Sequence, residues 1–169
     1  MKKARLLLSG ILLTAMAGSA YGQFSAGATI GVQVPLGDFG SSYHAGPGLN
    51  LTGRYAPTDN IRVGLNIGFN RYSDEWSGDW PVWMIPVTGL FEYHFGSKAV
   101  RPYVGGDIGI YRVQDDSYSE THVGFAPVAG VSFRASDIVS FLANLKYHYV
   151  AADYAFSWVG INVGASFEF

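Results

Sequence analysis

The sequence predicts an all-β protein: an eight-stranded antiparallel up-and-down transmembrane β-barrel. Two observations carry this prediction. Apolar and polar residues alternate in successive segments, and the charged residues of these segments keep to the polar face. Successive side chains of a strand point to opposite faces, so such alternation indicates a strand with one apolar and one polar side. The clearest case is Val159–Phe169, which has about the length that a tilted strand needs to cross a bilayer.

The composition fits a wall of such strands. Hydrophobic residues make up 49% of the chain and charged residues 14%, and the formal net charge of −2 gives no indication of nucleic-acid binding. The absence of cysteine excludes disulfides and thiolate metal sites. No later stretch approaches the roughly 18 unbroken apolar residues of a transmembrane helix.

The amino terminus has the pattern of a cleaved export signal. A basic start is followed by an apolar core too short to span a membrane, and Ala20-Tyr21-Gly22 offers small residues for cleavage. We therefore expect residues 1–22 to be a signal peptide and residues 23–169 to form the barrel domain. An uncleaved membrane anchor is the less favoured alternative.

Eight segments carry the alternation. In chain order they are Phe24–Val34, Gly48–Tyr55, Ile61–Asn70, Val82–Phe95, Arg101–Tyr111, His122–Arg134, Val139–Tyr149 and the terminal segment. Long and short connections alternate, as short periplasmic turns and longer outer loops require, and an even number of strands places both chain ends on the periplasmic side. We expect no helix and no second domain. Because proline cannot donate to a strand ladder, we expect bulges or strand ends at Pro86, Pro102 and Pro127.

The charged residues of these segments decide between a membrane barrel and a soluble one. On the polar face they are Arg54, Arg62, Glu92, Asp107, Arg134, Lys146 and Glu168. A soluble barrel buries its apolar face, whereas here the polar face must be the interior, because Arg or Lys facing lipid at mid-depth costs roughly 2–4 kcal/mol. Isolated charges in a narrow lumen are costly, so we expect an ion-pair network in which Glu92 and Glu168 each contact an arginine. Large inward side chains such as Tyr103 and Arg62 should fill the lumen; the alternative is that the inward glycines leave small water-filled voids.

Arg71 and Arg112 take the phase of the apolar face instead, at the outer ends of their strands. Lipopolysaccharide phosphates lie at that depth in a Gram-negative outer membrane. A guanidinium binds phosphate oxygens well while its stem lies along apolar surface, so we expect these arginines to contact lipopolysaccharide. The alternative is that both strands have already ended and both arginines are loop residues. An aromatic belt including Phe69 and Trp83 should mark the same interface.

Several short motifs have a familiar form. They are Pro35–Phe39, Pro102–Gly109, Gly124–Gly130 and the terminal Phe167-Glu168-Phe169. With the strand count, they make the chain similar to the eight-stranded outer membrane beta-barrel family, which includes the transmembrane domain of outer membrane protein A and outer membrane protein X. The compact porin-family proteins of Bacteroidetes-type bacteria are the most similar subtype.

This resemblance implies a cell outer membrane location and assembly by the barrel assembly machinery. In the family the terminal aromatic residues are the assembly signal, a role that falls on Phe167 and Phe169 here. The family's periplasmic peptidoglycan-binding domain does not follow the barrel in this sequence, so cell-wall anchoring is not expected. The expected partners are outer membrane lipids and lipopolysaccharide, and the expected state is a monomer.

Three functional classes remain open. We expect a structural or surface-interaction barrel with no open pore, because eight strands leave an interior just wide enough for side chains to fill. The alternatives are a narrow channel and a lipid A-modifying barrel enzyme. An enzyme needs a nucleophile beside a base, and His148 has no serine at close spacing. We expect no catalytic site, metal or cofactor, and the acidic and aromatic outer loops do not name an extracellular partner.

Overall fold

A computed structural model describes residues 24–74, 81–115, 119–152 and 155–169. The prediction of a signal peptide over residues 1–22 lies outside these ranges. Among the described residues, no helix has the length and hydrophobicity to cross a membrane.

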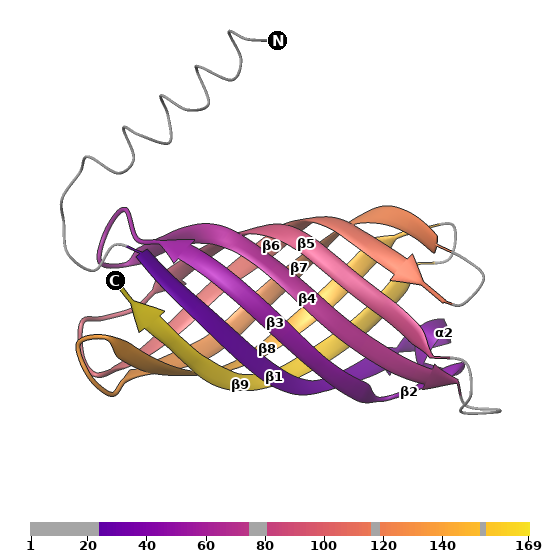
Figure 1. The fold of residues 1–169 in the computed structure, drawn as a ribbon, viewed down its shortest axis with the longest axis horizontal. Coiled ribbons are helices and arrows are strands. Elements are labelled where there is room, and N and C mark those ends of the chain that lie inside the picture. The colour runs from indigo at the N-terminus through magenta and orange to yellow at the C-terminus, as the bar shows by residue number, and fades with distance from the viewer. Residues whose placement is uncertain (1–23, 75–80, 116–118, 153–154) are drawn as a thin grey trace, which may run out of the picture.

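The strands form one closed wall (Figure 1). They are β1 (Phe24–Leu36), β3 (Gly46–Tyr55), β4 (Ile61–Asp74), β5 (Val82–His94), β6 (Val100–Gln114), β7 (Ser119–Arg134), β8 (Val139–Ala151) and β9 (Phe156–Glu168). Each strand pairs antiparallel with its neighbours along the chain, and β1 pairs with β9 to close the sheet. The predicted fold class, a closed eight-stranded antiparallel barrel, is therefore confirmed.

The connection between β1 and β3 contains structure that we did not expect. It holds a short helix, α2 (Gly37–Gly40), and a two-residue strand, β2 (Tyr43–His44), which pairs with the end of β4. The expectation that the chain has no helix was therefore wrong. Gly37 begins the helix at φ 61°, a conformation that glycine adopts without steric cost. The sharp turn there directs α2 back over the barrel, where Phe39 is buried.

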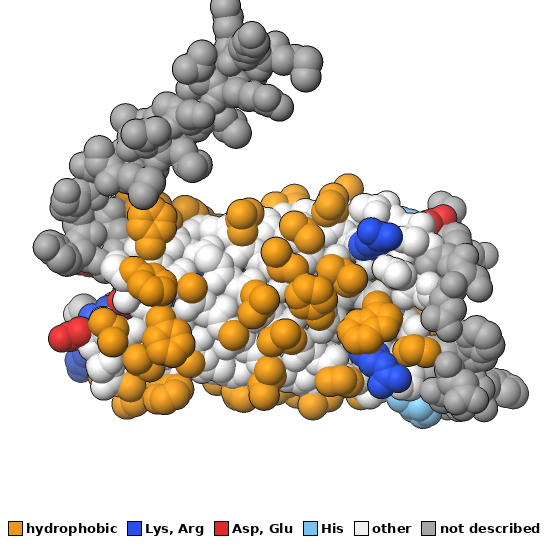
Figure 2. Space-filling view, in the orientation of Figure 1, with side chains coloured by type: hydrophobic (Ala, Val, Ile, Leu, Met, Phe, Trp, Pro, Cys, Tyr) orange, Lys and Arg blue, Asp and Glu red, His pale blue; other side chains and the backbone are white. Residues whose placement is uncertain are grey.

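Side-chain exposure follows the predicted alternation along each strand. The outward residues are apolar and exposed, among them Ile30, Leu65, Ile108 and Phe141. Figure 2 shows hydrophobic side chains across the middle of the visible face, with charged side chains near its two ends. Polar side chains are buried inside. This arrangement is the reverse of a soluble protein and suits a wall surrounded by lipid.

The predicted bulges or strand ends at the prolines are wrong for two of the three positions. At Pro86 and Pro127 we expected bulges or strand ends, but both lie inside strands whose register is the same on either side of the proline. Each instead interrupts one ladder locally. Gly68 makes room for the ring of Pro86, since a Cβ on Gly68 would lie 2.6 Å from Pro86 Cγ. Pro102 does lie near a strand end, one residue beyond the last β5–β6 pair.

Candidate functional site

The lumen is divided into layers along the barrel axis. We call the end that carries the carboxy terminus and the short turns the turn end, and the end that carries α2 the loop end (Figure 1). Charged side chains fill the turn-end part, amides and one ion pair the middle, and aromatic rings the loop end.

The charged layer contains two ion-paired glutamates. Arg54 donates from Nε and Nη2 to the Glu92 carboxylate at 3.0–3.3 Å, and both side chains are 6% exposed. His94 Nε2 lies 3.1 Å from Glu92 Oε2, the oxygen that also accepts from Arg54 Nε. Glu168 accepts from Arg62 at 3.0 Å and lies 3.7 Å from Arg134. Both glutamates thus contact arginines, as the predicted faces of these strands required.

The pairing partners depend on the strand between them. Arg62 is the direct cross-strand neighbour of Glu92, yet Glu92 binds Arg54, which lies one strand further on. Gly64 lies opposite Arg54 on the intervening strand β4. The Arg54 side chain spans β4 to reach the carboxylate, and a Cβ on Gly27 of β1 would lie 3.1 Å from Arg54 Nη1. Arg62 is thereby free to reach Glu168 across the lumen.

The middle layer repeats this arrangement. Lys146 Nζ lies 2.8 Å from Asp107 Oδ2, and the pair spans β7, where Ala126 lies opposite Asp107 and Val128 lies opposite Lys146. Thr88 also donates to Asp107, at 3.2 Å. A chain of amides runs beside the pair, in which Gln33 donates to Asn162 and Asn162 donates to Asn144. The lumen therefore holds its mid-depth charges as a pair supported by neutral hydrogen bonds.

An apolar layer closes the loop end. We call it the loop-end cap, and it consists of Phe39, Tyr72, Met84, Tyr111, Val150 and Trp158. Phe39 comes from α2, and its ring centroid lies 5.0 Å from that of Tyr72 and 6.5 Å from that of Trp158. Trp158 stacks on His148 at 4.4 Å, and the Tyr111 hydroxyl lies 3.1 Å from His148 Nδ1.

The loop-end cap was not predicted from the sequence. Tyr72, Tyr111 and Trp158 each take the inward phase close to the loop end of their strands, and that coincidence is the signal that could have revealed it. Phe39 carries no such signal, because it belongs to a segment without strand periodicity.

Neighbouring atoms occupy the positions that a Cβ would take at several inward glycines. A Cβ on Gly130 would lie 2.6 Å from the Tyr103 ring, and one on Gly124 would lie 2.7 Å from the Tyr111 ring. Elsewhere, as at Gly64, the carbonyl of the neighbouring strand occupies the position. Several buried amide oxygens, including that of Asn66, have no protein partner among the described residues, a situation in which proteins commonly bind internal water.

The two outward arginines lie on paired strands. Arg71 pairs with Trp83 across β4 and β5, and Arg112 pairs with Thr121 across β6 and β7. The alternative that both are loop residues was therefore wrong. Arg112 Nε donates to Ser119 at 3.0 Å. Within the described ranges, neither arginine takes part in an ion pair.

The remaining candidate positions lie apart from these clusters. Phe167 faces outward at the turn end, and the Phe169 amide donates to the Phe24 carbonyl at 2.8 Å. The part of the chain that the structure describes contains no group of three or more His, Cys, Asp or Glu side chains placed to hold a metal ion.

The sequence matches the outer membrane protein beta-barrel domain family over residues 4–167. The chain belongs to this family. Family membership and the closed barrel together assign it to the outer membrane of a Gram-negative type of cell. A comparison with curated protein sequences gives no significant match.

Solved structures of family-like barrels support the fold. Neisserial surface protein A is 19% identical with a TM-score of 0.74, over 89% of this chain and 100% of that one. Ail, the attachment invasion locus protein of Yersinia pestis, is 20% identical with a TM-score of 0.60, over 89% and 100%. OprG from Pseudomonas aeruginosa is 16% identical with a TM-score of 0.59, over 90% and 98%. At these identities the likeness establishes the architecture, and the role of this chain must be argued from its own residues.

Proposed function

We propose that this protein is a small integral outer membrane barrel that does not conduct ions and has a structural or surface-interaction role. The loop-end cap is the observation that carries this proposal. Phe39, Tyr72 and Trp158 lie ring against ring across the mouth, and Tyr72 and Trp158 are fully buried. An ion entering from this side would meet an apolar layer with no room for its hydration shell.

The layers below the loop-end cap support the same role. Lys146 and Asp107 neutralise each other at mid-depth, and Arg54 and Glu92 do so nearer the turn end. A conducting lumen needs water and sites that an ion can both enter and leave. The buried ion pairs of this lumen provide neither water nor such sites, because an ion pair would have to break before a passing ion could take the place of one partner.

Single-channel recording in planar bilayers tests the proposal. The wild-type barrel should give no resolved openings. A Phe39→Ala and Trp158→Ala double variant should give openings or transient leaks, because it removes two rings from the mouth. Phe125→Ala, which removes a lipid-facing ring, is the control and should stay silent. Regular stepwise openings of the wild type would favour the narrow-channel alternative, and deacylated lipid A in a lipid assay would favour the enzyme.

The loop-end connections are the natural surface for recognition, and their chemistry restricts the partner. The sequences Asp74-Glu75-Trp76 and Asp115-Asp116-Ser117-Tyr118 are acidic and aromatic. Ail has been solved in complex with sucrose octasulfate, a heparin analogue. For the loop-end connections alone, as distinct from the lipid-facing wall, we propose an extracellular partner that is not polyanionic, since like charges would oppose its approach. Immobilised heparin should therefore not retain the barrel, and a pull-down from native outer membranes with loop-deleted controls would identify what does bind.

Lipopolysaccharide is the second proposed partner. Arg71 and Arg112 both face outward near the loop end, and neither guanidinium forms an ion pair with a carboxylate of the described residues. A guanidinium binds phosphate oxygens well. Replacing both with glutamate should reduce the lipopolysaccharide that co-purifies with the folded barrel. Unchanged retention by a folded double variant would reject this contact without affecting the proposal of a closed lumen.

A further inference from the structure

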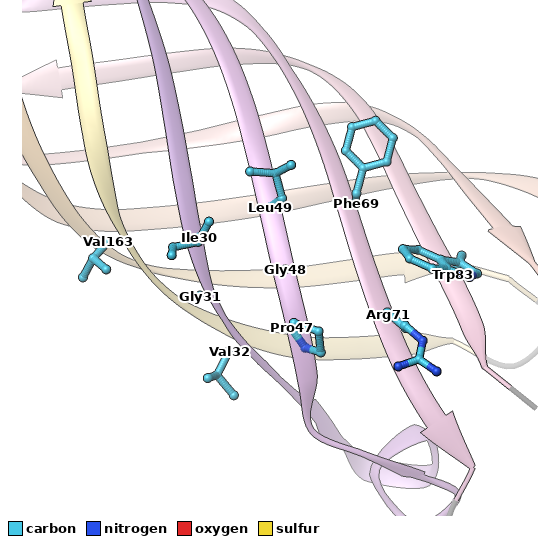
Figure 3. A pocket seen from close by; sticks show the side chains of 10 residues that line it. All are labelled: Ile30, Gly31, Val32, Pro47, Gly48, Leu49, Phe69, Arg71, Trp83 and Val163. Atoms are coloured by element: carbon cyan, nitrogen blue, oxygen red, sulfur yellow. The ribbon is translucent and has the colours of Figure 1, made fainter. Parts of the chain in front are cut away.

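A groove crosses the lipid-facing wall between β9 and β5 (Figure 3). Its volume is about 710 Å³. Two rows of outward side chains border it, aligned across the strands by the register. One row is Val163, Ile30, Leu49 and Phe69, and the other side is formed by Val32, Pro47, Arg71 and Trp83. The backbone of the paired Gly31 and Gly48 lies between the rows.

The groove leads from the loop end toward the middle of the wall. Arg71 lies near the loop end of β4, whereas Val163 lies in the middle of β9 (Figure 3). Crossing from β9 to β5 takes four steps between strands, or roughly 19 Å at about 4.8 Å a step. Because barrel strands tilt by about 35–45°, this path descends roughly 11–13 Å along the membrane normal, which is most of the about 15 Å of hydrocarbon in one leaflet. The groove can therefore hold the first part of an acyl chain that enters at the outer interface.

The groove is charged at its loop end and apolar along the rest of its length. The lining is aliphatic or aromatic except at Arg71, and no carboxylate of the described residues lies within ion-pair distance of that guanidinium. Trp83 lies directly beside Arg71, and tryptophan is typical of the level where lipid head groups begin. One cation at the interface and an apolar trough below it complement a lipid with an anionic head group and a long chain.

We propose that this groove holds one acyl chain of a lipopolysaccharide molecule whose phosphate is bound by Arg71. The inference rests on the proposed contact between lipopolysaccharide and the outward arginines, and it adds a binding site for one acyl chain, which we call the chain seat. The loop end faces the outer leaflet, where the phosphorylated lipid is lipopolysaccharide, and this decides between it and a phospholipid. Arg112 lies outside the groove lining and would contact phosphate without a chain seat.

The expected effects are moderate. In a bilayer the chain exchanges the groove for other acyl chains, so packing contributes to the affinity but the hydrophobic effect does not. Filling the groove should lower lipopolysaccharide retention about three- to tenfold, in line with packing energies inside membranes. Removing the charge-assisted contact in Arg71→Glu should lower it about tenfold or more.

Ile30→Trp tests the chain seat, since the larger side chain would occupy the groove at mid-length. The matched control is Ile108→Trp on β6. The two isoleucines are 62% and 67% exposed, both face lipid, and Ile108 does not line the groove. Val32→Phe is a second filling variant if Ile30→Trp does not fold, which gel mobility before and after heating will show.

Each variant is loaded with lipopolysaccharide, with lipopolysaccharide stripped of both its ester- and amide-linked acyl chains, or with phosphatidylglycerol, and the lipid retained after washing is counted by native mass spectrometry. We expect Ile30→Trp and Arg71→Glu to lose lipopolysaccharide, Ile108→Trp to retain it, and the fully deacylated form to bind weakly everywhere.

The outcomes separate the two proposals. If Arg71→Glu loses lipopolysaccharide but Ile30→Trp and Val32→Phe retain it, the chain seat is rejected and the arginine contact stands. If the arginine variants retain it, the contact fails and the seat fails with it. Equal retention of phosphatidylglycerol by the wild type would overturn the choice of lipopolysaccharide as the occupant.

Discussion

The Glu92 carboxylate is the strongest test of the lumen network. It accepts hydrogen bonds from Arg54 and lies beside His94, and its side chain is 6% exposed. In Glu92→Gln the amide keeps one acceptor oxygen, but the Arg54 charge loses its counter-ion in a site that water barely reaches. Breaking one partner of a buried pair typically costs 3–5 kcal/mol, so we expect a loss of about 3 kcal/mol in the free energy of unfolding.

The measurement is reversible urea unfolding of the barrel in lipid vesicles, followed by tryptophan fluorescence. Glu120→Gln is the control, because Glu120 also lies 3.1 Å from a histidine but is 45% exposed. An exposed pair contributes about 0–1 kcal/mol, so this variant should unfold close to wild type. In Arg54→Met with Glu92→Leu both charges are absent, and much of the stability should return. A Glu92→Gln loss as small as that of Glu120→Gln would show that the lumen is hydrated enough to screen its charges and would refute the reasoning.

Three further predictions use the same unfolding measurement or its variants. Lys146→Met should lower the free energy of unfolding by about 3 kcal/mol, because it leaves Asp107 unpaired. The double variant Lys146→Met with Asp107→Leu should recover most of that loss. Losses that simply add in the double variant would contradict the ion pair. Gly64→Ala should lower the free energy of unfolding by at least about 1 kcal/mol, because its Cβ would meet the Gly53 carbonyl and the adjacent Arg54 backbone. Gly53→Ala is the control and should be neutral, because the space around its Cβ is open. Equal effects of the two variants would contradict this packing. Phe39→Ala should cost about 3–5 kcal/mol if α2 is packed onto the loop-end cap, and a loss below about 1 kcal/mol would mean that α2 is only loosely attached.

The assembly role proposed for the terminal aromatic residues needs a kinetic test. Phe169→Ala should fold to nearly the same final stability in vesicles, since Phe169 lies beyond β9, which ends at Glu168. It should be slower only when the barrel assembly machinery is present in the membrane. Equal assembly rates for Phe169→Ala and wild type with the machinery present would remove this role.

The sequence by itself determined which way each strand residue faces. The period of a strand is two residues, so once the apolar face of β9 meets lipid, the phase of every alternating segment follows. This is why Arg54, Glu92 and Lys146 could be placed in the lumen and Arg71 on the outer wall without coordinates. It also explains why eight strands were counted although their ends were not known.

Only the tertiary structure decided what these residues contact. The direct cross-strand neighbour of Glu92 is Arg62, yet Glu92 binds Arg54 across the intervening strand β4. Phe39 reaches the mouth from a segment with no periodicity to predict it, and Pro86 stays in a strand because Gly68 makes room for its ring. Alternation along a strand is a local pattern, and it predicts only which face of the strand each residue occupies. Closure of the barrel brings residues from distant strands into contact across the lumen, and alternation within single strands does not predict which of them meet.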